Sequence, residues 1–150
     1  MNAALPRRRL RTWLRLLRIT RGTENRLREF LRVNFDTTLP RFDVVAALHR
    51  NDAPMKMSAL SQRLLVSNGN ATAVVDRLER DGLVGRTALS GDKRVVQVAL
   101  TDAGRAWFER IAAAHEAEVD TLFAGLGHDD MDALRDLMHR IEGTPDDEDE

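Results

Sequence analysis

Apolar residues recur at helical spacing through the first third of the chain. Between Pro6 and Val33, leucines and one tryptophan follow one another at helical intervals beside a stripe of arginines, which predicts one long amphipathic helix. Thr38, with Pro40 two residues later, is typical of a helix start and predicts a second helix. The turn-forming residues 51–54 separate this helix from the next one.

Two serine residues predict where the next two helices begin. Ser58 is expected to cap a third, short helix that ends near Val66. Ser67 is expected to cap a fourth helix, which ends at Gly82 because glycine adopts a left-handed backbone without strain. Two short helices joined in this way are typical of a helix-turn-helix.

Strand-forming residues replace the helical pattern after the fourth helix. The segments 83–89 and 95–100 are rich in apolar and β-branched residues and flank the charged turn 90–94. In the second segment Val96, Val98 and Leu100 alternate with other residues, as they do in a strand that is buried on one face. The pattern therefore predicts a β-hairpin.

The rest of the chain returns to a helical pattern. Thr101 predicts the cap of a fifth helix, and apolar residues from Met131 to Ile141 mark a sixth. Gly143 and the acidic tail 144–150 are expected to be disordered. The expected fold class is mainly α with a small β-hairpin, with about six helices in a single domain over residues 1–143.

The composition excludes several classes of protein and of functional site. The chain has no cysteine, which excludes disulfides, thiolate metal sites, cysteine nucleophiles and thiol redox sensing. No apolar run approaches the ~18 residues that cross a bilayer, and the arginine-rich start lacks the features of a signal peptide, so a cytoplasmic protein is expected. Because no nucleophile elbow, phosphate-binding glycine loop or zinc-binding helix is present in the sequence, we expect no enzyme, metal or cofactor.

The formal net charge of −1 conceals a strong segregation along the chain. Residues 1–33 contain ten arginines and two glutamates, a net charge of +8, whereas residues 101–143 contain four basic and ten acidic residues, a net charge of −6. Since both segments also carry apolar stripes, we expect them to meet, either within one chain or across a dimer interface.

The start of the fourth predicted helix carries short polar side chains. A helix that enters the major groove of DNA needs such side chains in its first turns to reach the base edges, and its free amides can hold a phosphate. The alternative is that these residues only cap the helix and form the turn. The candidate DNA-binding residues of the two short helices are Ser58, Ser67, Asn68, Asn70, Ala71, Thr72 and Arg77.

The charged hairpin would lie beside that helix as a wing. Arg86, Lys93 and Arg94 are candidates for contacts with the DNA backbone, and an arginine at the tip can enter the minor groove. Asp92 is expected to hold the guanidinium of Arg94 or Arg86, or alternatively only to form the turn. Together, these elements predict a winged helix-turn-helix over about residues 38–100.

Three sequence motifs point to a known family. They are the run Ser67-Asn-Gly-Asn-Ala-Thr-Ala-Val-Val-Asp-Arg-Leu-Glu-Arg-Asp-Gly-Leu-Val-Gly-Arg86, the triplet Asp92-Lys-Arg94, and Leu100-Thr-Asp-Ala-Gly104. In these motifs the chain resembles the MarR family of bacterial regulators. The resemblance implies a homodimer on a pseudo-palindromic operator in double-stranded DNA, with helices of about residues 6–33 and 101–143 as the dimerisation layer and a small ligand that tunes DNA affinity.

A narrower resemblance concerns the effector. Leu39-Pro-Arg-Phe-Asp-Val44 together with Val66-Ser-Asn-Gly-Asn70 is similar to members that control aromatic-acid and hydroxycinnamate catabolism, some of which respond to aryl-CoA thioesters. The implied effector is therefore anionic and aromatic. Candidate ligand-binding residues are Trp13, Arg21, Phe42, His49, Trp107, Phe108 and His115. Packing in the core is the alternative for the aromatic residues and the histidines.

The expected function is that of a homodimeric repressor, released from its operator by a small aromatic acid or its CoA thioester. Two alternatives stay open: a non-catalytic protein-interaction module, and a DNA-binding regulator with no small-molecule effector. The basic first helix could also lie on an anionic membrane, but the acidic last helices offer it a protein partner instead, and no membrane is expected.

Overall fold

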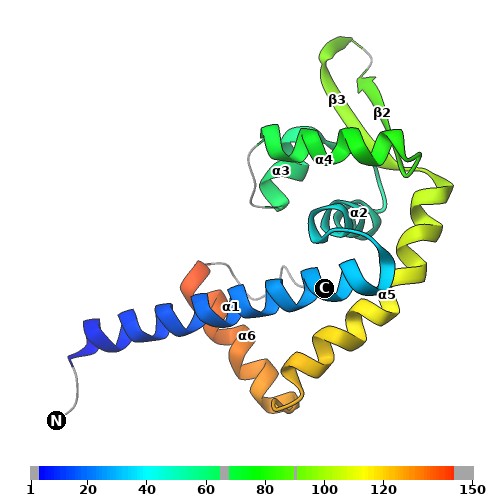
Figure 1. Cartoon of the computed structure of the whole chain (residues 1–150). Helices are drawn as coiled ribbons and strands as arrows, with labels where there is room; N and C mark the ends of the chain where they lie inside the picture. Colours follow the sequence, from blue (N-terminus) through cyan, green and yellow to red (C-terminus); the bar gives the residue numbers. More distant parts are fainter. Residues whose placement is uncertain (1–3, 65–67, 90, 144–150) are drawn as a thin grey trace.

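The computed structural model describes residues 4–64, 68–89 and 91–143. In this part of the chain six helices and three short strands form, as Figure 1 shows. The elements are α1 Leu5–Phe35, α2 Leu39–Asn51, β1 Met55–Lys56, α3 Met57–Arg63, α4 Asn68–Arg80, β2 Val84–Leu89, β3 Asp92–Leu100, α5 Asp102–Phe123 and α6 His128–Glu142. The expected mainly α, winged helix-turn-helix fold is confirmed.

The predicted starts of two helices, at the capping residues Thr38 and Thr101, are confirmed. Thr38 caps α2 by accepting a hydrogen bond from the backbone N–H of Arg41, and Thr101 caps α5 by accepting one from Gly104 at 3.0 Å. Helix α1 ends where Asp36 adopts a left-handed backbone with a φ of 49°. No described helix is both long enough and apolar enough to span a membrane.

The start of α3 differs from the prediction. The helix begins at Met57 with Lys56 as its cap, so Ser58 lies inside the first turn and is not the N-cap. The reason is β1, a two-residue strand that the sequence analysis missed and that leads directly into the helix. The described part of α3 ends at Arg63, and the predicted helix boundary at Val66 and Ser67 lies outside the described residues.

The three strands form one antiparallel sheet in the order β1-β3-β2. Its central strand β3 pairs Val98 with Met55 of β1 on one side, and Leu100 with Val84 of β2 on the other. The predicted hairpin is therefore confirmed as β2 and β3. It rises beyond α4 at one end of the molecule (Figure 1).

Two apolar clusters hold the elements together. The first lies in the winged-helix unit, where Leu60, Val75, Leu78 and Val98 are fully buried among residues of α2, α3, α4 and the sheet. The second joins α1, α2 and α5, with Ile111 fully buried at its centre. Helix α2 contributes to both clusters and so connects the winged-helix unit to the long helices.

The end of α6 corrects one further expectation. Gly143 is not disordered: it caps α6 with a φ of 72°, and its N–H donates to the carbonyl of His139 at 2.8 Å. Glycine fits this left-handed position because it has no Cβ. The tail 144–150 lies outside the described residues.

Candidate nucleic-acid interface

Helix α4 has one buried face and one polar face. Ala71, Val75 and Leu78 recur at helical spacing and are at most 1% exposed, so they anchor α4 on the first apolar cluster. Asn70 and Thr72 are exposed on the first turns. The assignment of Ala71 as a DNA contact is therefore wrong, because its side chain points into the protein.

The other candidates on the two short helices are only partly described. Arg77 is exposed in the last turns of α4, and Ser58 is exposed in the first turn of α3. Asn68 begins α4, but its side chain is not among those described, and Ser67 lies outside the described residues. Figure 1 shows α4 and the hairpin at the same end of the molecule, and the guanidinium of Arg86 in β2 lies 3.5 Å from the carbonyl of Thr72, so the wing lies beside the first turns of α4.

Arg86 is held within the protein. Its guanidinium lies 2.5 Å from a carboxylate oxygen of Asp76 and 3.3 Å from one of Glu79, both on α4, and its backbone N–H donates to Glu79 at 3.0 Å. The charge of Arg86 is therefore balanced by carboxylates of the same chain, which does not favour the expected contact of this guanidinium with the DNA backbone. These bonds fix β2 on α4, which makes Arg86 a positioning residue for the wing.

The tip of the wing carries the remaining basic candidates. Arg94 is exposed on β3, two residues after the strand begins. Asp92 and Lys93 form the start of that strand, but their side chains are not among those described, so the expected contact from Asp92 stays a prediction.

The C-terminal end of α4 is anchored on both sides. Arg41 of α2 forms an ion pair with Asp81, directly after α4, and the hydroxyl of Thr101 donates to the carbonyl of Gly82 at 2.6 Å. Gly82 has a φ of 76°, as predicted for the residue that ends this helix. These contacts fix the C-terminal end of α4, while Asn70 and Thr72 in its first turns are exposed to solvent.

Five of the seven ligand candidates pack against one another or against the apolar clusters, and of these Phe42 is buried and the other four are partly buried. Between α2 and α5, the ring of Phe42 lies 5.6 Å from Phe108 and 4.3 Å from His115, and His49 lies 4.4 Å from Phe108, measured between centroids. Trp107 packs against both apolar clusters. Burial lowers the pKa of His115 below its ordinary value. These contacts favour the core-packing alternative.

The other two candidates lie on a different part of the molecule. Trp13 and Arg21 are exposed on the N-terminal half of α1. The described chain therefore does not bring the seven predicted residues together around one ligand.

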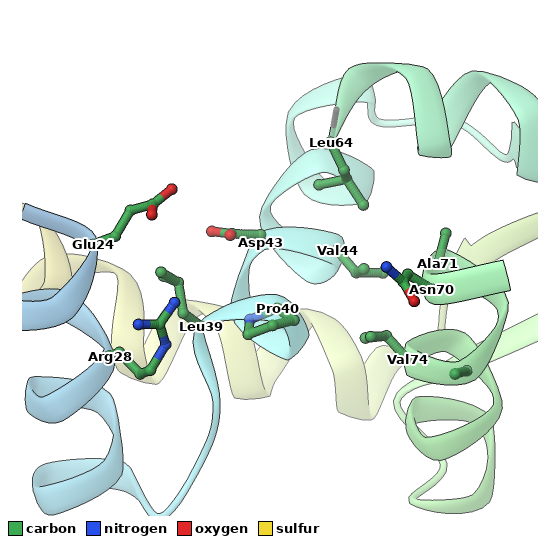
Figure 2. Close-up of a pocket in the computed structure, with 11 residues that line it drawn as sticks. Glu24, Arg28, Leu39, Pro40, Asp43, Val44, Leu64, Asn70, Ala71 and Val74 are labelled. Atoms are coloured by element: carbon green, nitrogen blue, oxygen red, sulfur yellow. The ribbon is translucent and has the colours of Figure 1, made fainter. Parts of the chain in front are cut away.

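A cavity that the sequence analysis missed lies between α1, α2 and α4. Its volume is about 480 Å³, and Figure 2 shows the carboxyl groups of Glu24 and Asp43 pointing towards each other across it. Although one side of Asp43 is exposed, burial against the cavity walls raises its pKa to about 6, and the negative charge of Glu24 adds to the rise. The only signal in the sequence was a lone acidic residue between Phe42 and Val44.

The opposite charges of the long helices meet at one described point. Arg26 of α1 donates to Glu118 of α5 at 2.7 Å within the chain. The arginines from Arg7 to Arg21 form no ion pair with any residue that the structure describes. The basic N-terminal half of α1 is thus left with both its charge and its apolar stripe uncovered in the single chain.

Comparison with known proteins agrees with this geometry. The model of the MarR family matches residues 37–96. The chain is 33% identical over 118 residues to the uncharacterized HTH-type transcriptional regulator YkoM of Bacillus subtilis. The aligned region covers 79% of this chain and 75% of that protein. It is 32% identical over 103 residues to the HTH-type transcriptional regulator PecS of Dickeya dadantii, covering 67% and 62%.

Solved structures agree in fold over nearly the whole chain. A mutant MarR from E. coli complexed with operator DNA has a TM-score of 0.77 and 26% identity, covering 93% of this chain and 99% of that chain. A MarR family transcriptional regulator from Silicibacter pomeroyi has a TM-score of 0.75 and 30% identity, covering 95% and 99%. None of these names refers to aromatic-acid catabolism, so the narrower resemblance stays a prediction.

Proposed function

The chain belongs to the MarR family of DNA-binding transcriptional regulators, and we propose that it acts as a homodimeric repressor at a pseudo-palindromic operator. The observation that carries the proposal is the exposed polar start of α4 beside the wing. Asn70 and Thr72 are the side chains that we expect to reach base edges, and Arg94 is the side chain that we expect to contact the phosphate backbone. Repression then needs only tight binding over a promoter.

Uncovered apolar side chains support the homodimer. On α1, Leu10, Trp13 and Leu14 are at least half exposed, and α6 exposes a second apolar set, Met131, Leu137, Met138 and Ile141. Large exposed apolar patches are typical of interfaces. The basic α1 and the acidic α6 also carry opposite charges, so a second copy could cover both sets. Such a dimer would place its two recognition helices about 34 Å apart, which is one turn of DNA.

A small aromatic acid, free or as its CoA thioester, is the proposed effector. It would act by binding more tightly to a form of the dimer whose recognition helices are wrongly spaced for the operator. The loss of DNA-binding free energy then cannot exceed the difference in effector-binding free energy between the two forms.

The test is fluorescence anisotropy of the purified protein on the intergenic DNA upstream of its own gene and on scrambled DNA, at two salt concentrations. The proposal predicts specific, salt-sensitive binding that an aromatic acid or hydroxycinnamoyl-CoA releases. Specific binding that no such compound releases would contradict the effector but keep the regulator. Absence of any salt-dependent DNA affinity would instead favour the protein-interaction module.

A further inference from the structure

We propose that the acidic segment 146–150 docks on a row of four arginines on α1 and shields this row from nucleic acid. The row, called the arginine row below, consists of Arg8, Arg11, Arg15 and Arg18. The segment consists of five consecutive acidic residues and lies outside the described residues. The inference concerns a surface on α1, apart from α4 and the wing, and does not depend on the proposed effector.

The four arginines share one face of α1. At 3.6 residues per turn, they fall within about 80° of one another around the helix axis. Leu27 and Leu31, the buried residues of α1, lie about 160° away by the same geometry. All four arginines are exposed. The arginine row therefore faces away from the apolar cluster that holds α1 in the fold.

No described acidic residue balances the arginine row. The sequence of α1 contains no acidic residue before Glu24, so the row lacks carboxylates three or four positions away with which its arginines would pair. Among the residues that the structure describes, no carboxylate forms an ion pair with the row. Like charges three and four positions apart repel one another along a helix. A bound anionic segment would relieve this repulsion.

The proposed dimer leaves the arginine row available. The exposed apolar stripe of α1, with Leu10, Trp13 and Leu14, is centred about 130° from the row around the helix axis. A second copy that covers this stripe therefore approaches α1 from another side. The row is suited to an anionic partner and not to an apolar one.

The acidic segment matches the arginine row in charge and in length. Its five carboxylates follow one another from Asp146 to Glu150, and no basic residue interrupts them. From Arg8 to Arg18 the row extends over about 15 Å along the helix axis, at a rise of about 1.5 Å per residue. Five extended residues span up to about 17 Å. One segment can thus place a carboxylate near each guanidinium.

The last described helix runs towards α1. Helix α6 has Gly143 as its C-cap, and Thr144 and Pro145 separate that residue from the acidic segment. His139, one turn before the cap, is 9% exposed, so the end of α6 lies against the protein. In the view of Figure 1, α6 runs back from its turn with α5 towards the N-terminal half of α1. Residues 144–150 can reach up to about 25 Å from there, to the arginine row of their own chain or of the partner subunit.

Docking would keep the arginine row from competing for DNA. Exposed arginines attract the phosphate backbone whatever the base sequence. A row outside the recognition helix and the wing would hold DNA away from both and reduce the share of protein bound at the operator. The acidic segment prevents this because its carboxylates occupy the positions that phosphates would take.

The first test locates the acidic segment by nuclear magnetic resonance, without DNA. Because the chain has no cysteine, Glu150→Cys carries a single spin label and keeps four of the five carboxylates. The label is expected to broaden the backbone amide signals of residues 8–18 at low salt and not at about 1 M, where the Debye length is about 3 Å. The broadening should also vanish when Arg11→Gln and Arg15→Gln are combined. Arg50→Gln, an exposed arginine on α2, is the matched control and should keep it.

Two results of this test would overturn the proposal. Broadening at α4 and the wing, around Arg77 and Arg94, in place of α1 would show that the acidic segment covers the DNA-binding face. Absence of salt-sensitive broadening outside α6 would show that the segment docks nowhere on the protein. Since the test uses no DNA, its outcome is independent of the proposed function.

The second test measures the shielding by fluorescence anisotropy on scrambled DNA. A neutral-segment variant replaces the five carboxylates with amides: Asp146→Asn, Asp147→Asn, Glu148→Gln, Asp149→Asn and Glu150→Gln. At low salt it is expected to bind scrambled DNA about tenfold more tightly than the wild type. Adding Arg11→Gln and Arg15→Gln should remove most of this gain, whereas the same two changes in the wild type should leave its affinity unchanged. The proposal is wrong if the gain persists without these arginines, or if their loss weakens binding by the wild-type chain.

Discussion

At the scale of single residues, the proposed recognition of a particular DNA sequence depends on the first turns of α4. Asn70 is exposed there, and an asparagine amide can pair with a base edge through two hydrogen bonds. Asn70→Ala is therefore expected to cost about 1–3 kcal/mol of binding free energy on the operator and little on scrambled DNA. Arg94→Ala is the matched comparison. Loss of a phosphate contact weakens binding to both DNAs and lowers the slope of log affinity against log salt concentration by about 1. Anisotropy titrations measure all four affinities, and equal losses for Asn70→Ala on both DNAs would contradict base reading.

The raised pKa of Asp43 makes the stability of the folded protein depend on pH. Its pKa is raised from 3.8 to about 6 in the folded chain, so ionisation costs the folded state free energy as the pH rises through about 6. Asp43→Asn lacks that cost and is expected to be more stable than the wild type by about 1 kcal/mol at pH ~8, a figure kept small because the carboxyl group is partly exposed.

Urea unfolding of both proteins between pH ~4 and ~8 measures this difference. The gain of Asp43→Asn should vanish towards pH ~4, where Asp43 is protonated in the folded protein. Since His115 titrates in both proteins, its opposite contribution cancels in the comparison. A gain that does not change with pH would contradict the raised pKa.

The sequence allowed part of the interface to be predicted at this scale. The exposure of Asn70 and Thr72 follows from the polar start of α4. Ala71 was assigned to the interface, but its helical spacing with Val75 is the pattern of a buried side chain, as the structure has it. Arg86 could not be interpreted in the same way. Its carboxylate partners are on a different element, so only the packing of β2 on α4 decides where its charge goes.

At the scale of elements, the start of α5 is pressed against the base of the wing. A Cβ added to Gly104 would lie 1.9 Å from the carbonyl oxygen of Leu83, which is a backbone atom and cannot rotate away. Gly104→Ala is therefore expected to destabilise the protein by about 2 kcal/mol or more. Gly22→Ala is the control, because nothing lies near that position in α1 and alanine favours a helix by up to about 1 kcal/mol.

Chemical denaturation of the two glycine variants tests this packing. The expected order of stability is Gly22→Ala first, the wild type second and Gly104→Ala last. Equal stability of Gly104→Ala and the wild type would show that α5 does not approach the wing as closely as described.

Local signals explain which elements the sequence could predict. Thr38 and Thr101 cap helices through bonds to residues three positions away, so their sequence context is sufficient. Strand β1 has only two residues, too few for any alternation, and exists because Met55 and Lys56 pair with β3 far along the chain. Ser58 was mistaken for a cap for the same reason, since β1 shifts the start of α3 to Met57.

At the scale of the whole molecule, the uncovered apolar stripe of α1 is the surface that we propose forms the dimer interface. Leu14→Glu places a charge in that stripe and is expected to convert the dimer into monomers, because a buried unpaired carboxylate is costly. Light scattering after size-exclusion chromatography measures the mass. Thr87→Glu, on an exposed position of β2, is the control and should stay dimeric. A wild-type monomer, or a dimer of Leu14→Glu, would contradict the assignment.

The segregation of charge was visible in the sequence, but the cavities were not. The net charges of the first and last segments follow from counting residues. A cavity of about 520 Å³ is lined by Arg28 and Arg32 from α1, Thr37 from the α1–α2 connection, Arg41 from the first turn of α2, and Arg77 from α4. No spacing along the chain brings these residues together, because their proximity depends on how α4 packs on α2 and α2 on α1.

The most direct test of the central claim, a dimer that reads two half-sites, is selection of binding sequences from random duplex DNA by the purified full chain. The account predicts enrichment of an inverted repeat whose half-site centres lie about 10 base pairs apart, because the two recognition helices enter successive major grooves. Enrichment of a single unrepeated motif would contradict the dimeric arrangement. If no sequence is enriched, the assignment of α4 as a base-reading helix is wrong.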